Sequence, residues 1–334
     1  MTPFVRCPST LATGYSSYSP TAIKTLFDGV SVSPVLTFDG PSSEEREAKE
    51  AIRNQGRISL SGVQPKFSMV IGENNKLRYT REGEQGHYIL KPAPTSYHIF
   101  EKSYCAANEH LTMQIASQVY GIETAPCAMI FFKNGEPAYI TRRFDFDGDQ
   151  KLAQEDFASL LGLTKTNGGS EYKYANGSYE ECAQIISRYV KAARIDVMRF
   201  FQLVLFNFIT LNDDAHLKNF SLINRGDGEY HLAPAYDLIN TSLHLRMPRI
   251  FALDKGLFKE GMHLSDTHTI GRNDFDEFGR RIGLSERLVK RELDIFASRQ
   301  PLAEQLISRS FLSEDLKHHY LQSYNYRRIT LNSK

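Results

Sequence analysis

The sequence has few of the residues and patterns that would place it in a specialised class of protein. Its 334 residues include four cysteines, and no two of them have the C-x-x-C spacing of a zinc or redox site. Their scatter also argues against a disulfide framework and is typical of a reducing cytoplasm. Hydrophobic residues make up 41% and charged residues 24% of the chain. These are ordinary values, so the length predicts a sizeable core in two domains or lobes.

Other absences narrow the function further. The formal net charge is +1 and no long run of Lys and Arg occurs, so the sequence predicts no direct contact with nucleic acid. The first ten residues lack the basic and apolar regions of a signal peptide. The longest apolar run, Phe200 to Leu211, is interrupted by Gln202 and Asn207 and is too short to span a membrane. We therefore expect a cytoplasmic protein that associates with DNA only through a partner.

The order of β-rich and helical segments predicts the fold class. Short β-rich segments such as "FSMVI", "LRYT" and "HYILK" alternate with Gly and Asn turns, and a helix is expected over residues 104–121. After residue 144 helical patterns dominate, including "EDFASLLGL" and an amphipathic helix over residues 179–190, while residues 166–179 are expected to form a mobile loop. We read this as an α+β fold with a smaller β-rich lobe over residues 1–145 and a larger helical lobe over residues 146–334.

The most informative stretch is "TLNDDAHLKNFSLI", residues 210–223, which follows the apolar run. A buried helix ending there would present a polar loop on a rigid support, and a hairpin would then lead to Asp237. Phosphoryl transfer needs a carboxylate near the attacking hydroxyl and oxygen ligands for Mg²⁺; in protein kinases four residues separate the catalytic aspartate from a metal-binding asparagine. Asp214 and Asn219 have this spacing, whereas five residues separate Asp213 from Asn219. Spacing and hairpin together indicate Asp214, Asn219 and Asp237 as a phosphoryl-transfer set, although loop aspartates commonly cap helices or turns.

Two other side chains of this loop leave alternatives open. His216 is expected to orient and stiffen the loop rather than to touch the substrate. Lys218 either neutralises phosphate charge or is simply solvated.

Two segments nearer the N-terminus supply the remaining candidates. "RISLSGVQPKFSMVI" offers Ser59, Ser61 and Gly62 in a turn whose hydroxyl and N–H groups suit phosphate oxygens, although the segment taken alone favours an ordinary hairpin turn. Lys91 lies in a strand where alternation points it toward the core. A buried lysine needs a partner, and Glu109 in the following helix is a candidate.

With these residues in place, the chain resembles the HipA family of serine/threonine kinases. The resemblance runs from about Ser59 to beyond Asp237 and rests on seven ordered motifs: "SLSGVQPK", "YILKPAP", "NEHLTMQIA", "RRFDF", "LAQEDFASLLGL", "NDDAHLKNFSLI" and "LAPAYDLIN".

The resemblance implies a two-lobed protein-kinase-like fold that uses ATP and Mg²⁺. On the matched positions it implies that Asp214 is the catalytic aspartate and that Asn219 and Asp237 bind magnesium. We group His216 with Asp214 as a catalytic residue in the orienting part given above. It also implies an ATP site made of the following residues: Lys91, Ser59, Ser61, Gly62, Arg142 and Phe144, with Arg142 to Phe144 matching the hinge that packs on adenine.

Members of this family are toxins of toxin–antitoxin systems that phosphorylate aminoacyl-tRNA synthetases and autophosphorylate a serine of the phosphate loop, here Ser59 or Ser61. The chain is most similar to the short HipT type of HipBST systems, because it has two loop serines and the region ahead of the core in long members is expected to be absent. The implied partners are a synthetase substrate, a small HipS-like protein and a DNA-binding HipB-like antitoxin. A small-molecule kinase of related fold, and a non-catalytic subunit of a protein–DNA complex, are the alternatives.

Overall fold

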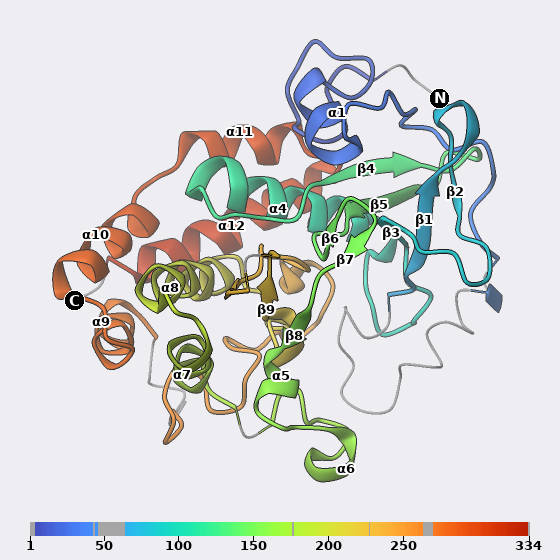
Figure 1. Ribbon diagram of the computed structural model, residues 1–334. Coiled ribbons are helices and arrows are strands. Elements are labelled where there is room, and N and C mark those ends of the chain that lie inside the picture. The colour runs from blue at the N-terminus through green and yellow to red at the C-terminus, as the bar shows by residue number, and fades with distance from the viewer. Residues whose placement is uncertain are drawn as a thin grey trace.

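The computed structural model describes residues 4–42, 44–45, 64–175, 177–226, 228–262 and 270–332. Most of the expected β-rich segments form one antiparallel sheet with the strand order β2-β1-β3-β5-β4 (Figure 1). The strands are β1 (Phe67–Ile71), β2 (Leu77–Tyr79), β3 (Tyr88–Pro92), β4 (Cys127–Phe131) and β5 (Pro137–Arg142). The short 3-10 turns Glu73–Asn75 and Lys102–Tyr104 lie in the connections.

Different elements cover the two faces of this sheet. Side chains alternate between the faces along each strand, so one strand contributes residues to both. Helix α1 (Pro20–Phe27) begins as expected, with Ser19 Oγ accepting a hydrogen bond from Ala22 N, and its Phe27 packs with Leu90 in one core. Helix α4 (Cys105–Tyr120) ends at Gly121 in the left-handed conformation and belongs with Tyr139 to a second, larger core. Neighbouring residues of β3 and β5 therefore reach different cores.

The remainder of the chain is mainly helical, with α8 at its centre (Figure 1). Helix α8 is buried along most of its length and contacts α7, α10 and α12, while α11 contacts α4. The helices are α5 (Phe157–Leu160), α6 (Lys165–Gly168), α7 (Tyr179–Tyr189), α8 (Ala193–Ile209), α9 (Arg272–Arg281), α10 (Glu286–Ala297), α11 (Pro301–Arg309) and α12 (Glu314–Thr330). The C-terminal helices thus return to the helix that covers the β-sheet.

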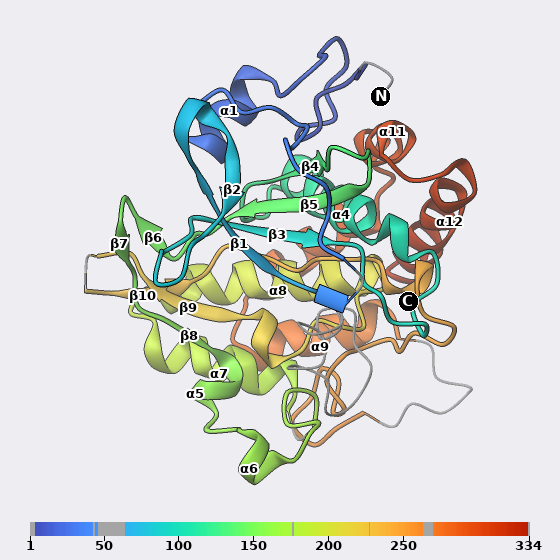
Figure 2. The same cartoon turned by 90° about the vertical axis from the view of Figure 1, so that its right-hand side faces the viewer.

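Two small sheets complete the fold. Strands β8 (Gln154–Asp156), β9 (Ser221–Asn224) and β10 (Tyr230–Leu232) form an antiparallel sheet in the order β10-β9-β8, which Figure 2 shows below the five-stranded sheet. Strands β6 (Phe146–Asp147) and β7 (Gln150–Lys151) pair separately, and 3-10 turns occupy Leu217–Asn219 and Thr241–Leu243. The hairpin expected between the polar loop and the last aspartate is therefore present as β9 and β10.

Two local predictions differ from the structure. The segment "EDFASLLGL" begins as part of β8 and continues into the single helical turn α5, because the strand pairs with β9 and Gly162 then adopts a φ of 68°. Residues 166–179 do not form a uniformly exposed loop, since Tyr174 and Tyr179 are each only 1% exposed and belong to the larger core.

The predicted α+β class is confirmed by this arrangement of antiparallel sheet and helices. The boundary between residues 145 and 146 stays a prediction. Among the residues that the structure describes, no helix is both long and apolar enough to cross a bilayer.

Candidate phosphoryl-transfer site

The polar loop after α8 is held by asparagines that interrupt apolar sequence. Asn207, in the last turns of α8, accepts a hydrogen bond at its Oδ1 from Asn212 Nδ2 at 3.0 Å, and Asn212 Oδ1 in turn accepts Asp214 N at 3.3 Å. Asn207 and Asn212 are 5% and 2% exposed, so these bonds form inside the core. The polar break in the apolar run thus fixes the backbone that presents Asp214.

The two adjacent aspartates of the loop have different surroundings. Asp213 Oδ2 accepts the backbone N–H of Arg249 at 2.8 Å, and its own N–H donates to Thr241 Oγ1 at 3.3 Å. Asp214 Oδ1 instead accepts the hydroxyl of Tyr174 at 2.7 Å. The Asp213 carboxylate therefore bonds to backbone of a neighbouring segment, whereas the Asp214 carboxylate bonds to a side chain.

Tyr174 is a site residue that the sequence reasoning missed. It comes from the segment expected to be a mobile loop, yet its side chain is buried and its ring meets the edge of the His216 ring at 5.0 Å between centroids. Forty positions separate Tyr174 from Asp214 in the chain. Neither its composition nor its spacing in a Gly- and Asn-rich stretch signalled this contact.

A second group of charged side chains forms on the α4 side of the five-stranded sheet. Lys91 of β3 lies with its Nζ 2.5 Å from Glu109 Oε1 and 2.5 Å from Asp237 Oδ1. Lys66, just before β1, lies with its Nζ 3.0 Å from Asp237 Oδ2. The structure thus brings together Lys91 and Glu109, the pair expected from the sequence. Lys91 also pairs with Asp237, so all three residues form one group. Lys66 was not a predicted site residue, although it ends the motif "SLSGVQPK".

This group contains two ammonium and two carboxylate groups, so its formal charges balance. The pKa values of the four side chains follow from their burial and from their attraction to one another. Burial lowers the pKa of Lys91, but the charges of Asp237 and Glu109 outweigh this and raise it above its usual value. Burial would raise the pKa of Asp237, but the two lysines bring it below its usual range. Burial dominates for Lys66, whose pKa is lowered, and for Glu109, whose pKa is raised. Asp237 is therefore held as the carboxylate anion.

Helix α4 also positions the backbone that follows Asp237. Asn108 Nδ2 donates to Asn240 O at 2.7 Å, and Asn108 Oδ1 accepts Asn240 N at 3.1 Å, so one amide satisfies both backbone groups of Asn240. Asp237 itself adopts the left-handed conformation with a φ of 56°, which is uncommon for a residue other than glycine and which Asp tolerates better than most. Two adjacent residues of α4 therefore support this segment. Asn108 holds the backbone of Asn240, and Glu109 pairs with Lys91, which in turn pairs with Asp237.

The oxygen donors available near this group suit a hard divalent cation. Asn219 Oδ1 is buried and has no hydrogen-bond partner among the described residues, which leaves an amide oxygen for another ligand. Asn219 lies in the loop of Asp214, and its neighbour Lys218 accepts at its carbonyl the hydroxyl of Tyr236, the residue before Asp237. Amide and carboxylate oxygens are preferred ligands of Mg²⁺. Asn219 and Asp237 therefore fit the metal-binding roles that the sequence assigns to them.

The surroundings of His216 and Lys218 bear on the roles that each residue can play. His216 is 4% exposed, and burial lowers the pKa of its imidazole to about 3, so the ring is neutral at neutral pH. Its backbone N–H donates to Asp214 O at 2.8 Å, and its carbonyl accepts Asn219 N at 2.8 Å. This supports an orienting part for His216. Lys218 is exposed and forms an ion pair with Asp156.

The structure does not bring every predicted ATP-site residue to this place. Lys91 pairs with Tyr139 in the β3–β5 register, and the Lys91 Nζ lies 5.1 Å from the Tyr139 ring. Arg142, an odd number of positions further along β5, projects to the opposite face and pairs there with Asp28 beside α1. The Arg142 side chain therefore points away from the group around Lys91, and its place in the hinge of the ATP site stays a prediction. Phe144 does lie near the site, with its ring 5.4 Å from that of Tyr236. The predicted Ser59, Ser61 and Gly62 lie outside the described residues.

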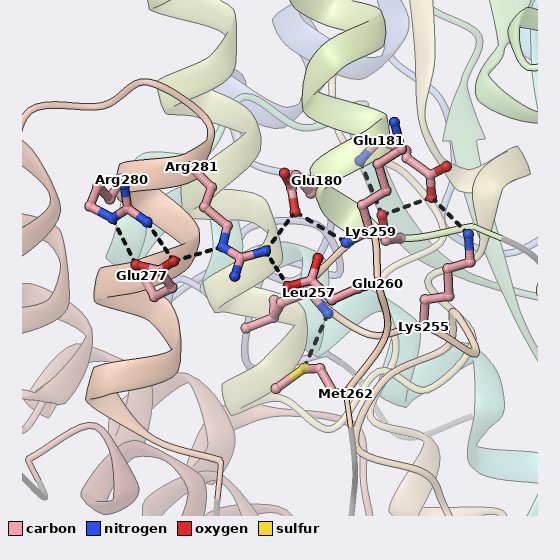
Figure 3. Close-up of polar contacts among 11 residues, drawn as sticks. Glu180, Glu181, Lys255, Leu257, Lys259, Glu260, Met262, Glu277, Arg280 and Arg281 are labelled. Atoms are coloured by element: carbon pink, nitrogen blue, oxygen red, sulfur yellow. Dashed lines mark hydrogen bonds and ion pairs between the residues drawn. The ribbon is translucent and has the colours of Figure 1, made fainter.

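Residues 255–260, which follow Asp237 in the chain, are tied to two helices by charged groups (Figure 3). Arg281 of α9 pairs with Glu260 at 2.6 Å and with Glu180 of α7 at 3.5 Å, and Glu180 also accepts Lys259 N at 3.1 Å. Lys255 pairs with Glu181 of α7 at 3.6 Å. This part of the chain is thus held to α7 and α9.

Comparison with known proteins identifies relatives of the whole arrangement. The sequence pattern of the HipA-like C-terminal domain matches residues 58–302. A Haemophilus influenzae protein described as "Putative kinase" is 28% identical over 95% of this chain and 93% of its own length. The serine/threonine-protein kinase toxin HipA of Shewanella oneidensis is 26% identical over 56% of this chain, which spans 44% of that toxin.

The solved structures show the same fold. The chain superposes with a TM-score of 0.65 and 22% identity on a chain of the Shewanella oneidensis toxin–antitoxin complex of HipA, HipB and operator DNA. The match covers 84% of this chain and 66% of that one. The predicted HipA-like, kinase-like arrangement of an α+β chain is confirmed by this likeness.

Proposed function

This chain belongs to the family of HipA-like C-terminal domains, and on that premise we propose that it is an ATP-dependent protein kinase that phosphorylates serine or threonine. The observation that carries the proposal is the meeting of Lys91, Glu109 and Asp237 in one ion-paired group on the sheet side. Asp214 stands on a separate, rigidly bonded loop that also carries Asn219. Kinase chemistry requires both parts: cations and a metal for the nucleotide phosphates, and a carboxylate for the acceptor hydroxyl.

In the proposed reaction Asp214 accepts the proton of the acceptor hydroxyl while that oxygen forms a bond to the γ-phosphorus of ATP. The bond from this phosphorus to the oxygen that bridges it to the β-phosphate breaks, and ADP leaves. Asp214 is suited to this part because its loop is fixed and its carboxylate lines an open cavity. The hydroxyl of Tyr174 donates to Asp214 Oδ1 and so helps to orient the carboxylate.

Lys66 and Lys91 would neutralise the negative charge of the phosphates. Both ammonium groups bond to Asp237 in the structure, and phosphate oxygens would offer them alternative anionic partners. Asn219 Oδ1 and the Asp237 carboxylate would hold Mg²⁺, which when bound supplies further positive charge at the phosphates.

The family resemblance supports a finer proposal. We propose that the kinase is a toxin of the short HipT type, that it phosphorylates a serine of an aminoacyl-tRNA synthetase, and that it autophosphorylates Ser59 or Ser61. HipS-like and HipB-like proteins are its proposed partners. The Shewanella HipA to which the chain is similar was solved together with HipB and operator DNA, which supports an antitoxin partner of this kind.

Incubation of the purified chain with γ-labelled ATP and Mg²⁺ tests the proposal, with and without a cell lysate. We expect labelled protein bands with the wild type and none with Asp214→Asn. Phosphosite mapping in cells expressing the chain, against an Asp237→Asn control, would identify the acceptor serines. Label that enters only small molecules would favour the small-molecule kinase. If neither the wild type nor Asp214→Asn transfers any label, the non-catalytic subunit would be favoured.

A further inference from the structure

A cavity of about 580 Å³ opens beside Asp214. Tyr174, Asp213 and Asp214 line it together with two other groups of residues: Tyr97, His98 and Phe100, and Leu245, Arg246, Met247 and Arg249. Its volume is typical of a ligand site. Lys66, Lys91 and Asp237 are absent from its lining, so it is not the space expected for the nucleotide phosphates. It is instead the open approach to the carboxylate that is proposed to receive the acceptor proton.

The rim of this cavity carries large apolar side chains that are unusually exposed. Tyr97 is 84%, Met247 90% and Phe100 40% exposed. An apolar patch at the mouth of a site is typical of a surface that binds a partner. Because Tyr97 and Met247 project almost completely into solvent, they offer contacts beyond the cavity itself. This favours a chain-like occupant over a small molecule that would fit inside.

The charge of the rim is positive. Arg246 is exposed, its guanidinium lies 4.9 Å from the centre of the Phe100 ring, and no carboxylate among the described residues pairs with it. Arg249, also exposed, already pairs with Asp254. Arg246 is thus a cation held over an aromatic ring and available to an acidic group of a partner.

Both of these groups are fixed rather than loose. Phe100 N donates to His244 O at 3.0 Å, and His244 Nδ1 lies 2.9 Å from Phe100 O, which joins the two groups. Ile99 and Leu245 pack in one small apolar cluster. Further along, Lys255 pairs with Glu181 of α7 and Glu260 pairs with Arg281 of α9, which hold the chain to these two helices (Figure 3). A groove preformed in this way lowers the entropic cost of ordering on binding.

We propose that this groove, formed by Tyr97, Phe100, Arg246 and Met247, docks the acceptor segment of a protein substrate. The occupant is an extended segment that directs a serine or threonine hydroxyl at Asp214, places bulky apolar side chains on the aromatic and methionine rim, and places an acidic side chain against Arg246. The inference rests on the proposed kinase function and adds to it the sequence class of the acceptor.

Phosphorylation of a serine-centred peptide library with labelled ATP tests the inference. One flanking position at a time is randomised, and wild type is compared with Arg246→Glu, Met247→Ser and the matched control Ile195→Ser. Ile195 is 67% exposed at the start of α8 and does not line the groove. The readout is the ratio of labelling between peptides within each variant, which does not depend on how much active enzyme a preparation contains.

We expect the wild type and Ile195→Ser to favour peptides with acidic and bulky apolar residues near the serine. Arg246→Glu should shift the acidic-to-basic ratio toward basic peptides, by roughly fivefold or more for a charge reversal at a partner-facing rim. Met247→Ser should reduce the preference for apolar residues and leave the charge preference in place. A change of the charge preference in one variant and of the apolar preference in the other would not arise from a general loss of folding.

Two results would overturn the inference while leaving the kinase function intact. One is labelling of peptides with the same ratios in all four proteins. The other is phosphosites, mapped on labelled lysate proteins, that lack acidic and apolar neighbours. Label entering a small molecule rather than any peptide or protein would overturn the inference and the proposed protein-kinase function together.

Discussion

Removing the hydroxyl of Tyr174 isolates the contact that holds the proposed catalytic carboxylate. Tyr174→Phe keeps the buried ring and its edge contact with His216, and deletes the donor that lies 2.7 Å from Asp214 Oδ1. A hydrogen bond to a charged group contributes about 1.5–3 kcal/mol. If that contribution is needed to orient Asp214 in the transition state, kcat should fall roughly ten- to hundredfold.

Steady-state transfer of labelled phosphate to a protein acceptor, with ATP varied, measures this effect. We expect kcat to fall while the KM for ATP changes little, because Asp214 is proposed to act on the acceptor hydroxyl. Tyr179→Phe is the matched control: Tyr179 is equally buried, and its hydroxyl donates to the carbonyl of Ala215 in the same loop at 3.1 Å. Its loss should lower stability by about 1 kcal/mol with little change in kcat.

The reasoning would be refuted if the two tyrosine variants lost kcat to the same extent. In that case the loop as a whole, and not the bond to Asp214, would set the rate. An unchanged kcat in Tyr174→Phe would show that the carboxylate is oriented without this donor.

Three further predictions concern other buried groups. Asp214→Asn should abolish phosphoryl transfer, while Asp213→Asn should retain a measurable share, because the Asp213 carboxylate bonds to loop backbone. Glu109→Gln should lower the free energy of unfolding in urea by about 3 kcal/mol, since it removes one counterion of the buried Lys91. Burial lowers the pKa of His110 to about 4, so its contribution to stability is present above pH 6.5, the unfolded value, and is lost as pH falls toward 4. His110→Gln should reduce the slope of unfolding free energy against pH in that window by up to about 1.4 kcal/mol per unit.

Each of these has an internal control. Equal loss of activity in folded Asp213 and Asp214 variants would contradict the assignment made from spacing. Glu84→Gln breaks an ion pair at the surface, where solvent screens the charges, and should cost much less than Glu109→Gln; an equal cost would contradict the buried-pair argument. The wild type measured over the same pH range is the control for His110→Gln. An unchanged slope in this variant would contradict the assignment of the titration to burial.

The fold could be read from the sequence where local signals agree. Strand β3 and helix α4 lie where alternation, periodicity and the Gly121 C-cap place them. The reading was wrong at "EDFASLLGL", because the pairing of β8 with β9 overrides helical periodicity there, and that pairing joins residues far apart in the chain. It was also incomplete at residues 166–179, where turn-forming composition concealed two buried tyrosines.

The sequence by itself predicted that Asp214 rather than Asp213 is catalytic, because that choice depends on spacing within one segment. It also predicted that Lys91 needs a buried partner, because that conclusion depends on alternation within one strand. Only the tertiary structure decided that Lys66 shares Asp237 with Lys91, that Tyr174 holds Asp214, and that the Arg142 side chain lies on the far face of the sheet. Those facts depend on strand register and on packing between segments distant in the chain. Side-chain periodicity gives the alternation along a strand but not which neighbour it meets.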